Sequence, residues 1–133
     1  MKVAITGSRY YENVRKLKDA LFQLKTKFGD KLIILSGGDQ YGIDKFAKKY
    51  ALEFGITYQE YNPAHTPKNL YSALHENYYG KEYAPKNFFH RNKMIAKYVD
   101  YLIAFIPEGK KASGSEHTIK EAKKLNKKVV IIS

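Results

Sequence analysis

Short apolar segments alternate with amphipathic segments along the chain, and this alternation predicts the fold. Residues 2–6, 32–35 and 101–106 are apolar runs of the length expected for strands buried on both faces. Residues 56–61 alternate apolar and polar side chains, which predicts a less buried strand at a sheet edge. Residues 128–132 predict a last strand. The chain should therefore contain five strands, separated by longer amphipathic segments.

The segments between these strands carry the spacing of amphipathic helices. In residues 13–28, apolar residues recur at three- and four-residue steps, which gives one apolar face. Similar patterns predict helices over residues 43–54, 88–98 and 116–126, and a short one near 69–76. Alternating strands and helices with right-handed crossovers predict an α/β fold, a Rossmann-like doubly wound sheet that is mainly parallel and ordered 3-2-1-4-5.

The predicted sheet belongs to a single domain, residues 1–133, with one irregular insertion at about residues 62–89. Three prolines punctuate this insertion, and four tyrosines crowd it: Tyr71, Tyr78, Tyr79 and Tyr83. Long irregular segments in compact domains are usually functional or mobile. The insertion is either a lid, from which a tyrosine would stack on a ligand, or an interface in a homodimer or higher homo-oligomer.

Composition narrows the possible chemistry. The chain has no cysteine, which excludes disulfides and thiolate catalysis and fits a cytoplasmic protein. Its four histidines lack the close spacing of metal ligands, so we expect no metal and no cofactor. No apolar run approaches the ~18 residues that cross a bilayer, so we expect no membrane partner.

The formal net charge of +11 favours acidic partners such as a polyphosphate ligand or nucleic acid. The lysines are spread over all the predicted helices, however, which is typical of solvated helix faces. No known nucleic-acid motif accompanies them. A nucleic-acid partner is thus possible but not favoured by the charge alone.

Small residues follow three of the predicted strands, at the edge where Rossmann-like sheets bind ligands. The three turns are Gly7-Ser8-Arg9, Ser36-Gly37-Gly38 with Asp39 and Asp44 behind it, and Ser113-Gly114-Ser115. Backbone amides at helix starts hold phosphate, and an arginine fork donates two parallel hydrogen bonds to it. Asp44 has two open interpretations, as a helix cap or as a partner of a ribose hydroxyl.

Arg91 and Asn92 begin the helix before the fourth strand and complete the candidate site. A cation at a helix start is electrostatically unfavourable, so we expect an anion or a carboxylate close to Arg91. If the protein is an enzyme, Arg91 and Glu116 are the candidate catalytic residues. Glu116 is equally suited to the first turn of a helix, where carboxylates are favoured.

As a set, these segments resemble the SLOG superfamily, the Rossmann-like group that includes DprA, the Lonely Guy phosphoribohydrolases and small YpsA-like proteins. Gly7-Ser8-Arg9 is similar to the opening turn of the small members, and the stretch from Ser36-Gly37-Gly38 to Gly42-Ile43-Asp44 resembles that of DprA. Arg91-Asn92, with Met94 and Asp100, resembles the segment in which Lonely Guy enzymes place a catalytic arginine.

The resemblance implies a binding protein that senses or sequesters a nucleotide or a nucleotide-derived molecule. Lonely Guy enzymes carry Pro-Gly-Gly-x-Gly-Thr-x-x-Glu with a catalytic glutamate, and in this chain that position falls on Thr118. Glu116 lies two residues earlier, on another side of the predicted helix. The alternatives are a nucleoside-monophosphate N-glycosidase or deoxyribosyl transferase, and DprA-like binding of single-stranded nucleic acid.

Overall fold

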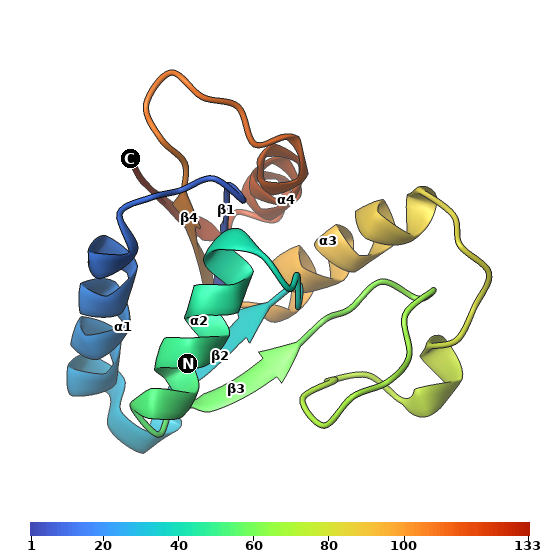
Figure 1. Cartoon of the computed structure of the whole chain (residues 1–133), viewed down its shortest axis with the longest axis horizontal. Coiled ribbons are helices and arrows are strands. Elements are labelled where there is room, and N and C mark those ends of the chain that lie inside the picture. The colour runs from blue at the N-terminus through green and yellow to red at the C-terminus, as the bar shows by residue number, and fades with distance from the viewer.

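A computed structural model describes all residues, 1–133, and contains one five-stranded sheet (Figure 1). The strands are β1 (Lys2–Gly7), β2 (Ile33–Ser36), β3 (Thr57–Glu60), β4 (Tyr101–Phe105) and β5 (Lys128–Ile132). The α-helices are α1 (Val14–Phe28), α2 (Gly42–Glu53), α3 (Lys86–Tyr98) and α4 (Ser113–Lys124), with short 3-10 turns η1 (Gly29–Lys31) and η2 (Glu76–Tyr78).

The strand order is β3-β2-β1-β4-β5, and every pairing is parallel, which confirms the predicted topology. The central strand β1 pairs with β2 on one side and β4 on the other, so that Ala4 faces Leu35 and Leu102. Helices α1 and α2 cover one face of the sheet, and α3 and α4 cover the other (Figure 1).

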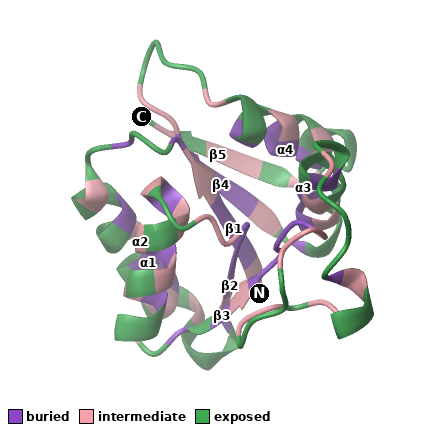
Figure 2. Cartoon of the chain, turned by 45° about the vertical axis from the view of Figure 1, so that its right-hand side comes forward, coloured by how far each residue is buried: buried purple, intermediate pink, exposed green.

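Each face of the sheet has its own apolar core, because successive side chains of a strand point to opposite faces. On β1, Val3 and Ile5 pack toward α1 and α2, and Ala4 between them packs toward α3 and α4. The buried strands lie between two partly exposed helical layers (Figure 2). The near-continuous apolar runs of the sequence follow from this burial on both sides.

Two helices begin earlier than the sequence predicts. Helix α3 starts at Lys86, so Arg91 lies beyond its first turn and not at its start. Helix α4 starts at Ser113, so Ser113-Gly114-Ser115 forms its first turn and not the preceding loop. Serine and glycine are typical of both loops and helix starts, which is why the pattern placed the beginning of α4 three residues late.

The insertion contains no helix at residues 69–76, contrary to the sequence prediction; its only helical turn is η2. A buried carboxylate at the end of β3 explains the difference. The Glu60 side chain accepts hydrogen bonds from the hydroxyl of Tyr58 (2.8 Å) and from the amides of Asn62 (3.1 Å) and Asn69 (2.8 Å). Ser72 forms a parallel bridge with Glu60. These bonds hold the chain extended, where local spacing alone favours a helix.

The tyrosines of the insertion contact other aromatic rings, although the exposed fraction of Tyr83 is 65%. Tyr79 is buried, and its ring meets that of Tyr78 edge-on, with centroids 5.2 Å apart. The ring of His65 contacts both Tyr83 (4.8 Å) and Phe88 of α3 (5.0 Å). The insertion is thus tied to α3. None of the helices in the structure is long and apolar enough to span a bilayer.

Candidate functional site

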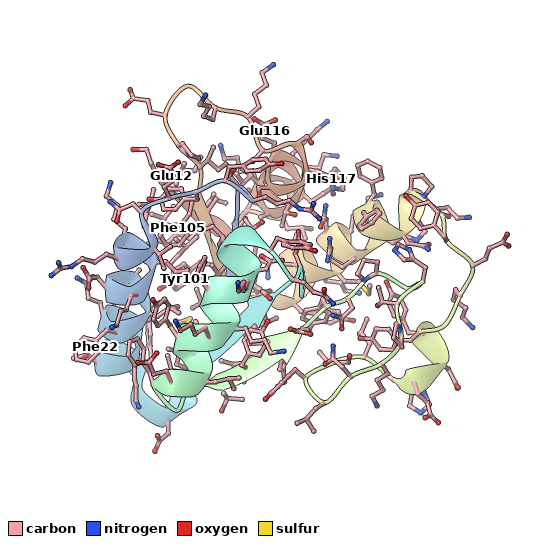
Figure 3. The ribbon with its side chains drawn as sticks, in the orientation of Figure 1. Glu12, Phe22, Tyr101, Phe105, Glu116 and His117 are labelled. Carbon is pink, nitrogen blue, oxygen red and sulfur yellow. The ribbon has the colours of Figure 1, made fainter.

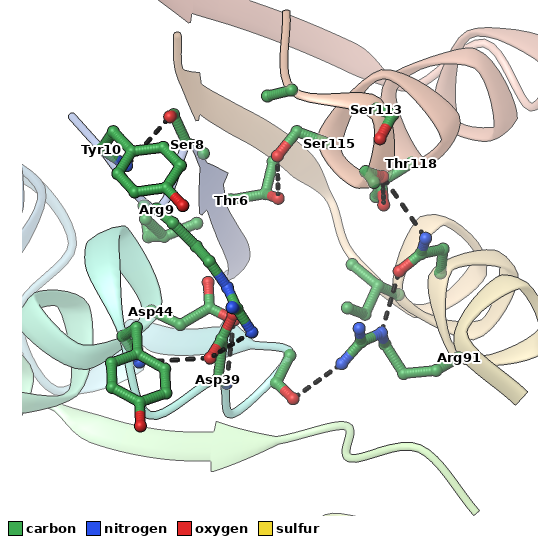
Figure 4. Close-up of a pocket in the computed structure, with 18 of the residues that line it drawn as sticks. Thr6, Ser8, Arg9, Tyr10, Asp39, Asp44, Arg91, Ser113, Ser115 and Thr118 are labelled. Atoms are coloured by element: carbon green, nitrogen blue, oxygen red, sulfur yellow. Dashed lines mark hydrogen bonds and ion pairs between the residues drawn. The ribbon is translucent and has the colours of Figure 1, made fainter. Parts of the chain in front are cut away.

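A cavity of about 350 Å³ opens at the carboxyl ends of β1 and β4, where the strand order reverses (Figure 4). Eleven of the residues predicted for the site line it: Gly7, Ser8, Arg9, Gly37, Asp39, Asp44, Arg91, Asn92, Ser113, Gly114 and Ser115. Eight other residues complete the lining: Ile5, Thr6, Tyr10, Tyr41, Ile95, Lys111, Ala112 and Thr118. Of these, the sequence points only to Lys111, as a loop residue able to add positive charge. The topology therefore brings the three small-residue turns and α3 together.

Three predicted residues lie outside the cavity lining. Ser36 is fully buried, and its hydroxyl hydrogen-bonds the hydroxyl of Tyr58 (2.7 Å) and accepts the amide of Gly38 (3.1 Å). Gly38 has a positive φ of 75° and packs against the side chains of Asn62 and Glu60. Glu116 is exposed on α4 (Figure 3), and Thr118 lines the cavity instead.

Arg91 joins α3 to the loop after β2. Its Nη1 donates to the carbonyl of Gly37 (2.7 Å) and to that of Tyr61 (3.3 Å), and its Nε donates to Asn92 Oδ1 (2.8 Å). Burial lowers the pKa of Arg91, and the negative charges of Asp44 and Asp39 raise it. The carboxylates expected near this cation are therefore Asp44 and Asp39.

Gly37 is required for this contact with Arg91. A β-carbon at position 37 would collide with the guanidinium of Arg91, which donates to the carbonyl of the same residue. The Asp44 carboxylate is also close to that position. The glycine thus permits the arginine to reach the backbone, a role that a single sequence does not reveal.

Arg9 is held at the cavity by an ion pair. Its Nε lies 3.0 Å from Asp39 Oδ2, and its guanidinium lies over the ring of Tyr41, 5.3 Å from the centroid. Asp39 also accepts the amide of Tyr41 through Oδ1 (3.1 Å). More than half of the Arg9 side chain stays exposed. A ligand anion would therefore meet a guanidinium already oriented by Asp39.

Asp44 lies in the first turn of α2 and faces the cavity. Its Oδ2 accepts the amide of Asp39 (3.1 Å), so it fixes the preceding loop while lining the cavity. Burial raises the pKa of Asp44 to about 6, although the Asp39 amide and Arg91 both oppose this rise. The neighbouring charges of Asp39 and Glu60 raise it further. Near neutral pH this group can exchange a proton.

The first turn of α4 lines the cavity. The first hydrogen bond of this helix runs from the amide of Glu116 to the carbonyl of Ala112 (2.8 Å), so the amides of residues 113–115 have no partner within the helix. The hydroxyls of Thr6 and Ser115 hydrogen-bond each other (2.9 Å). Asn92 Nδ2 donates to the carbonyl of Gly114 (3.3 Å). This turn is thus fixed from both β1 and α3.

The aromatic residues at the cavity are Tyr10 and Tyr41, and no tyrosine of the insertion lines it. Both rings are largely exposed, with exposed fractions of 82% and 62%. Stacking of a tyrosine from residues 62–89 on a ligand stays a prediction, and the tyrosines that line the cavity itself come from the loops after β1 and β2.

Charged groups of both signs face the cavity. Arg9, Arg91 and Lys111 supply positive charge, and Asp39 and Asp44 supply carboxylates. The cations and the first turn of α4 can bind an anion, and the carboxylates can accept hydrogen bonds from hydroxyl or amino groups. Histidine, cysteine, aspartate and glutamate side chains form no cluster of three or more that would hold a metal ion.

Comparison with known proteins gives a matching family model and several solved structures of similar fold. Residues 1–66 match the model of the YAcAr family, described as the YspA, cpYpsA-related SLOG family. No curated protein matches the chain. Similar solved structures include DNA processing protein A from Helicobacter pylori, described as binding single-stranded DNA, with 24% identity and a TM-score of 0.69. The match covers 98% of this chain and 64% of that protein, so the chain spans less than two thirds of its length.

Two further structures are described as molybdenum cofactor proteins. One is the carrier protein of Chlamydomonas reinhardtii, with 20% identity and a TM-score of 0.67, and the other is the binding protein of Rippkaea orientalis, with 19% identity and a TM-score of 0.71. Each match covers 98% of this chain and 74% of the other protein. At these identities the likeness establishes the fold.

Proposed function

Because the chain belongs to the SLOG superfamily, we propose that its cavity binds a nucleotide or a nucleotide-derived small molecule. The observation that carries the proposal is the first turn of α4, whose unpaired amides at residues 113–115 line a cavity that also holds cationic side chains. Backbone amides at a helix start favour a phosphate group both by hydrogen bonding and through the helix dipole.

In this proposal, the phosphate lies between the first turn of α4 and Lys111. The carboxylates of Asp39 and Asp44 lie across the cavity, on the loop after β2 and at the start of α2, and would accept hydrogen bonds from sugar hydroxyls or base amino groups (Figure 4). The exposed rings of Tyr10 and Tyr41 offer flat surfaces for a base.

The two kinds of similar structure agree with ligand binding in general. One is described as binding single-stranded DNA and the others as holding the molybdenum cofactor. The alternative is a glycosidase or deoxyribosyl transferase with Glu116 as its candidate catalytic carboxylate. Glu116 is exposed and lies outside the cavity lining, which favours this alternative less. The carboxylates that line the cavity are Asp39 and Asp44.

The test is isothermal titration calorimetry with AMP, ADP, adenosine and inorganic phosphate, with each mixture analysed by mass spectrometry for released base. We expect AMP or ADP to bind more tightly than adenosine, and to be recovered intact. Equal affinity for adenosine and AMP would contradict a phosphate site. Release of adenine would instead identify an N-glycosidase.

Two neighbouring lysines provide a matched pair of variants. Lys111 lines the cavity and Lys110 does not, although both belong to the loop before α4. We expect Lys111→Gln to weaken AMP binding about tenfold, the value of one charge-assisted hydrogen bond of roughly 1.5 kcal/mol. Lys110→Gln removes the same charge and should leave the affinity nearly unchanged. Equal losses in both variants would reduce the role of Lys111 to long-range electrostatics.

A further inference from the structure

The side-chain amide of Asn92 connects the cavity to a histidine outside its lining. Asn92 is buried on α3, and its Oδ1 accepts a hydrogen bond from Nε of Arg91 (2.8 Å; Figure 4). Its Nδ2 donates to the carbonyl of Gly114 (3.3 Å), in the first turn of α4. A guanidinium can only donate and a carbonyl can only accept, so these two neighbours fix which end of the amide is oxygen and which is nitrogen.

The orientation of this amide determines where His117 carries its proton. Nδ2 of Asn92 has two protons, and the one not used by Gly114 faces Nδ1 of His117, 3.3 Å away. Nδ1 must therefore be an acceptor without a proton. The ring proton is then on Nε2, which lies 3.6 Å from Oε1 of Glu121. All these contacts are satisfied together only when His117 is neutral.

The surroundings of His117 favour this neutral form. Only 19% of its side chain is exposed, and the ring of Phe89 meets it edge-on with centroids 4.8 Å apart. Burial lowers the pKa of His117 below the ordinary value of 6.5, and Glu121 opposes this shift. Three nearby cations lower the pKa further: Lys93 on α3, and Lys120 and Lys124 on α4. His117 is thus neutral at pH 7 and takes up a proton in more acidic solution.

We propose that His117 is a positioning residue of the cavity, and that its protonation weakens the binding of a nucleotide phosphate. The ligand in this inference rests on the proposed function. In the protonated ring Nδ1 becomes a donor, and it then faces Nδ2 of Asn92, which is a donor too. Glu121 attracts the charged ring and keeps it in place, so the amide of Asn92 is the group that turns over.

The turned amide loses both of its contacts with cavity residues. Its Nδ2 then faces the guanidinium of Arg91, which cannot accept, and its Oδ1 faces the carbonyl of Gly114, which cannot donate. Arg91 and Gly114 both line the cavity, so the loss loosens the guanidinium and the first turn of α4 together. A charge on His117 acting through space would instead attract phosphate and strengthen binding. The two effects have opposite signs, so the pH dependence distinguishes them.

The test is the affinity for AMP between pH 7.5 and pH 5.0, measured by calorimetry in the unaltered protein and in His117→Asn. The asparagine places an oxygen near the position of Nδ1, and this oxygen accepts from Asn92 at every pH. We expect equal affinities at pH 7.5, and at pH 5.0 roughly fivefold to tenfold weaker binding by the unaltered protein, the value of one charged hydrogen bond. The ratio of the two affinities cancels the titration of the AMP phosphate. A constant ratio, or tighter binding by the unaltered protein at pH 5.0, would overturn the proposal.

An NMR titration without ligand separates a failure of this positioning role from a failure of the proposed function. In the free protein, the side-chain amide signals of Asn92 and the Nε–H signal of Arg91 should shift as His117 titrates, and in His117→Asn this shift should disappear. If the shift occurs but AMP does not bind at any pH, the positioning role is supported and the nucleotide is rejected. If these signals do not follow His117, the positioning role is overturned whether or not AMP binds.

His90 provides the matched control. It lies on α3 next to Arg91, but it is exposed and does not line the cavity. His90→Gln therefore removes an imidazole at a similar distance along the chain from Arg91 without touching Asn92. We expect its AMP affinities and its NMR titration to match those of the unaltered protein at every pH. A loss of the pH dependence in His90→Gln would assign the effect to the wrong histidine and overturn the proposal.

Discussion

Arg91 Nη1 donates a hydrogen bond of 2.7 Å to the carbonyl of Gly37, and this bond joins two elements that are 54 residues apart in the sequence. The guanidinium thereby fixes the loop after β2 against α3. The same side chain lines the cavity, so one residue both builds the site and faces its ligand.

This dual role predicts that Arg91→Ala reduces both stability and ligand affinity. In the variant, the carbonyls of Gly37 and Tyr61 would lose a charged donor. We expect the free energy of unfolding to fall by about 2 kcal/mol, measured by urea titration. Arg91→Lys keeps the positive charge but lacks the forked guanidinium, so its free energy of unfolding should lie between those of Arg91→Ala and the unaltered protein. Unchanged stability in Arg91→Ala would contradict the bracing role.

Two glycines that line the same cavity should respond differently to alanine. A methyl group at Gly37 meets the Arg91 guanidinium, and one at Gly114 meets nothing within 4 Å. We expect Gly37→Ala to lower the free energy of unfolding by about 1–3 kcal/mol, as overpacking does. Gly114→Ala, in a helical first turn, should lose no stability. Urea titrations of both variants compare these costs directly, and equal costs would exclude the steric explanation.

The raised pKa of Asp44 predicts a pH dependence of stability. Because folding raises its pKa from 3.8 to about 6, the folded protein retains a proton between these values that the unfolded chain has lost. The contribution of this group is therefore full at the acidic end and disappears as the pH rises through about 6. Its size is up to about 3 kcal/mol at ~1.36 kcal/mol per pKa unit.

Asp44→Asn isolates this contribution from that of other carboxylates. The variant should unfold with a higher free energy than the unaltered protein at pH 7.5, and the difference should shrink toward pH 4.5. Asp19→Asn, at an exposed position, removes an equal charge and should show a flat difference. A flat difference for Asp44→Asn as well would show that burial does not perturb this carboxyl group. Urea titrations across the pH range supply the data.

The hydrogen bonds of Glu60 predict that this residue holds the insertion in place. Glu60→Ala leaves the hydroxyl of Tyr58 and the amides of Asn62 and Asn69 without their acceptor. We expect a loss of about 1–3 kcal/mol, because the buried amide of Asn62 loses its acceptor, whereas Asn69 is exposed and the Tyr58 hydroxyl keeps Ser36. Hydrogen exchange should accelerate at the amide of Ala73, which donates to the Glu60 carbonyl. Glu53→Ala, at the exposed end of α2, should change neither quantity.

The fold could be predicted from the sequence because its apolar periodicity and its tertiary burial agree. The buried strands and the helix spacing specify the order of the five strands, and the structure confirms that order. The prediction is wrong at residues 69–76, where a carboxylate nine residues away recruits Asn69. Local spacing contains no information about that partner, because Glu60 belongs to a strand and approaches only when the chain is folded.

The sequence predicts where the site lies, but it does not predict which side chains contact each other there. Small residues after parallel strands must meet at one sheet edge, so most of the predicted residues line the cavity. The sequence does not show which of these residues pair with each other. The ion pair of Arg9 with Asp39, for example, depends on side-chain geometry in the folded protein. Tyr10 and Tyr41 were missed because an exposed tyrosine in a turn has no distinctive pattern. Thr6 was missed because the sequence pattern indicates only that it ends a strand.

The hydrogen bond between Thr6 of β1 and Ser115 of α4 joins positions that are 109 residues apart, so the cavity is complete only when segments from near both ends of the chain have come together. A nascent or proteolysed chain that lacks α4 lacks the part of the cavity lining that Ser113, Gly114, Ser115 and Thr118 supply. Such a chain would compete poorly for the ligand. Ligand binding would then select fully assembled molecules and stabilise them by mass action, as any ligand does that binds only the native state. Occupancy of the cavity thus becomes a measure of how much of the protein has finished folding.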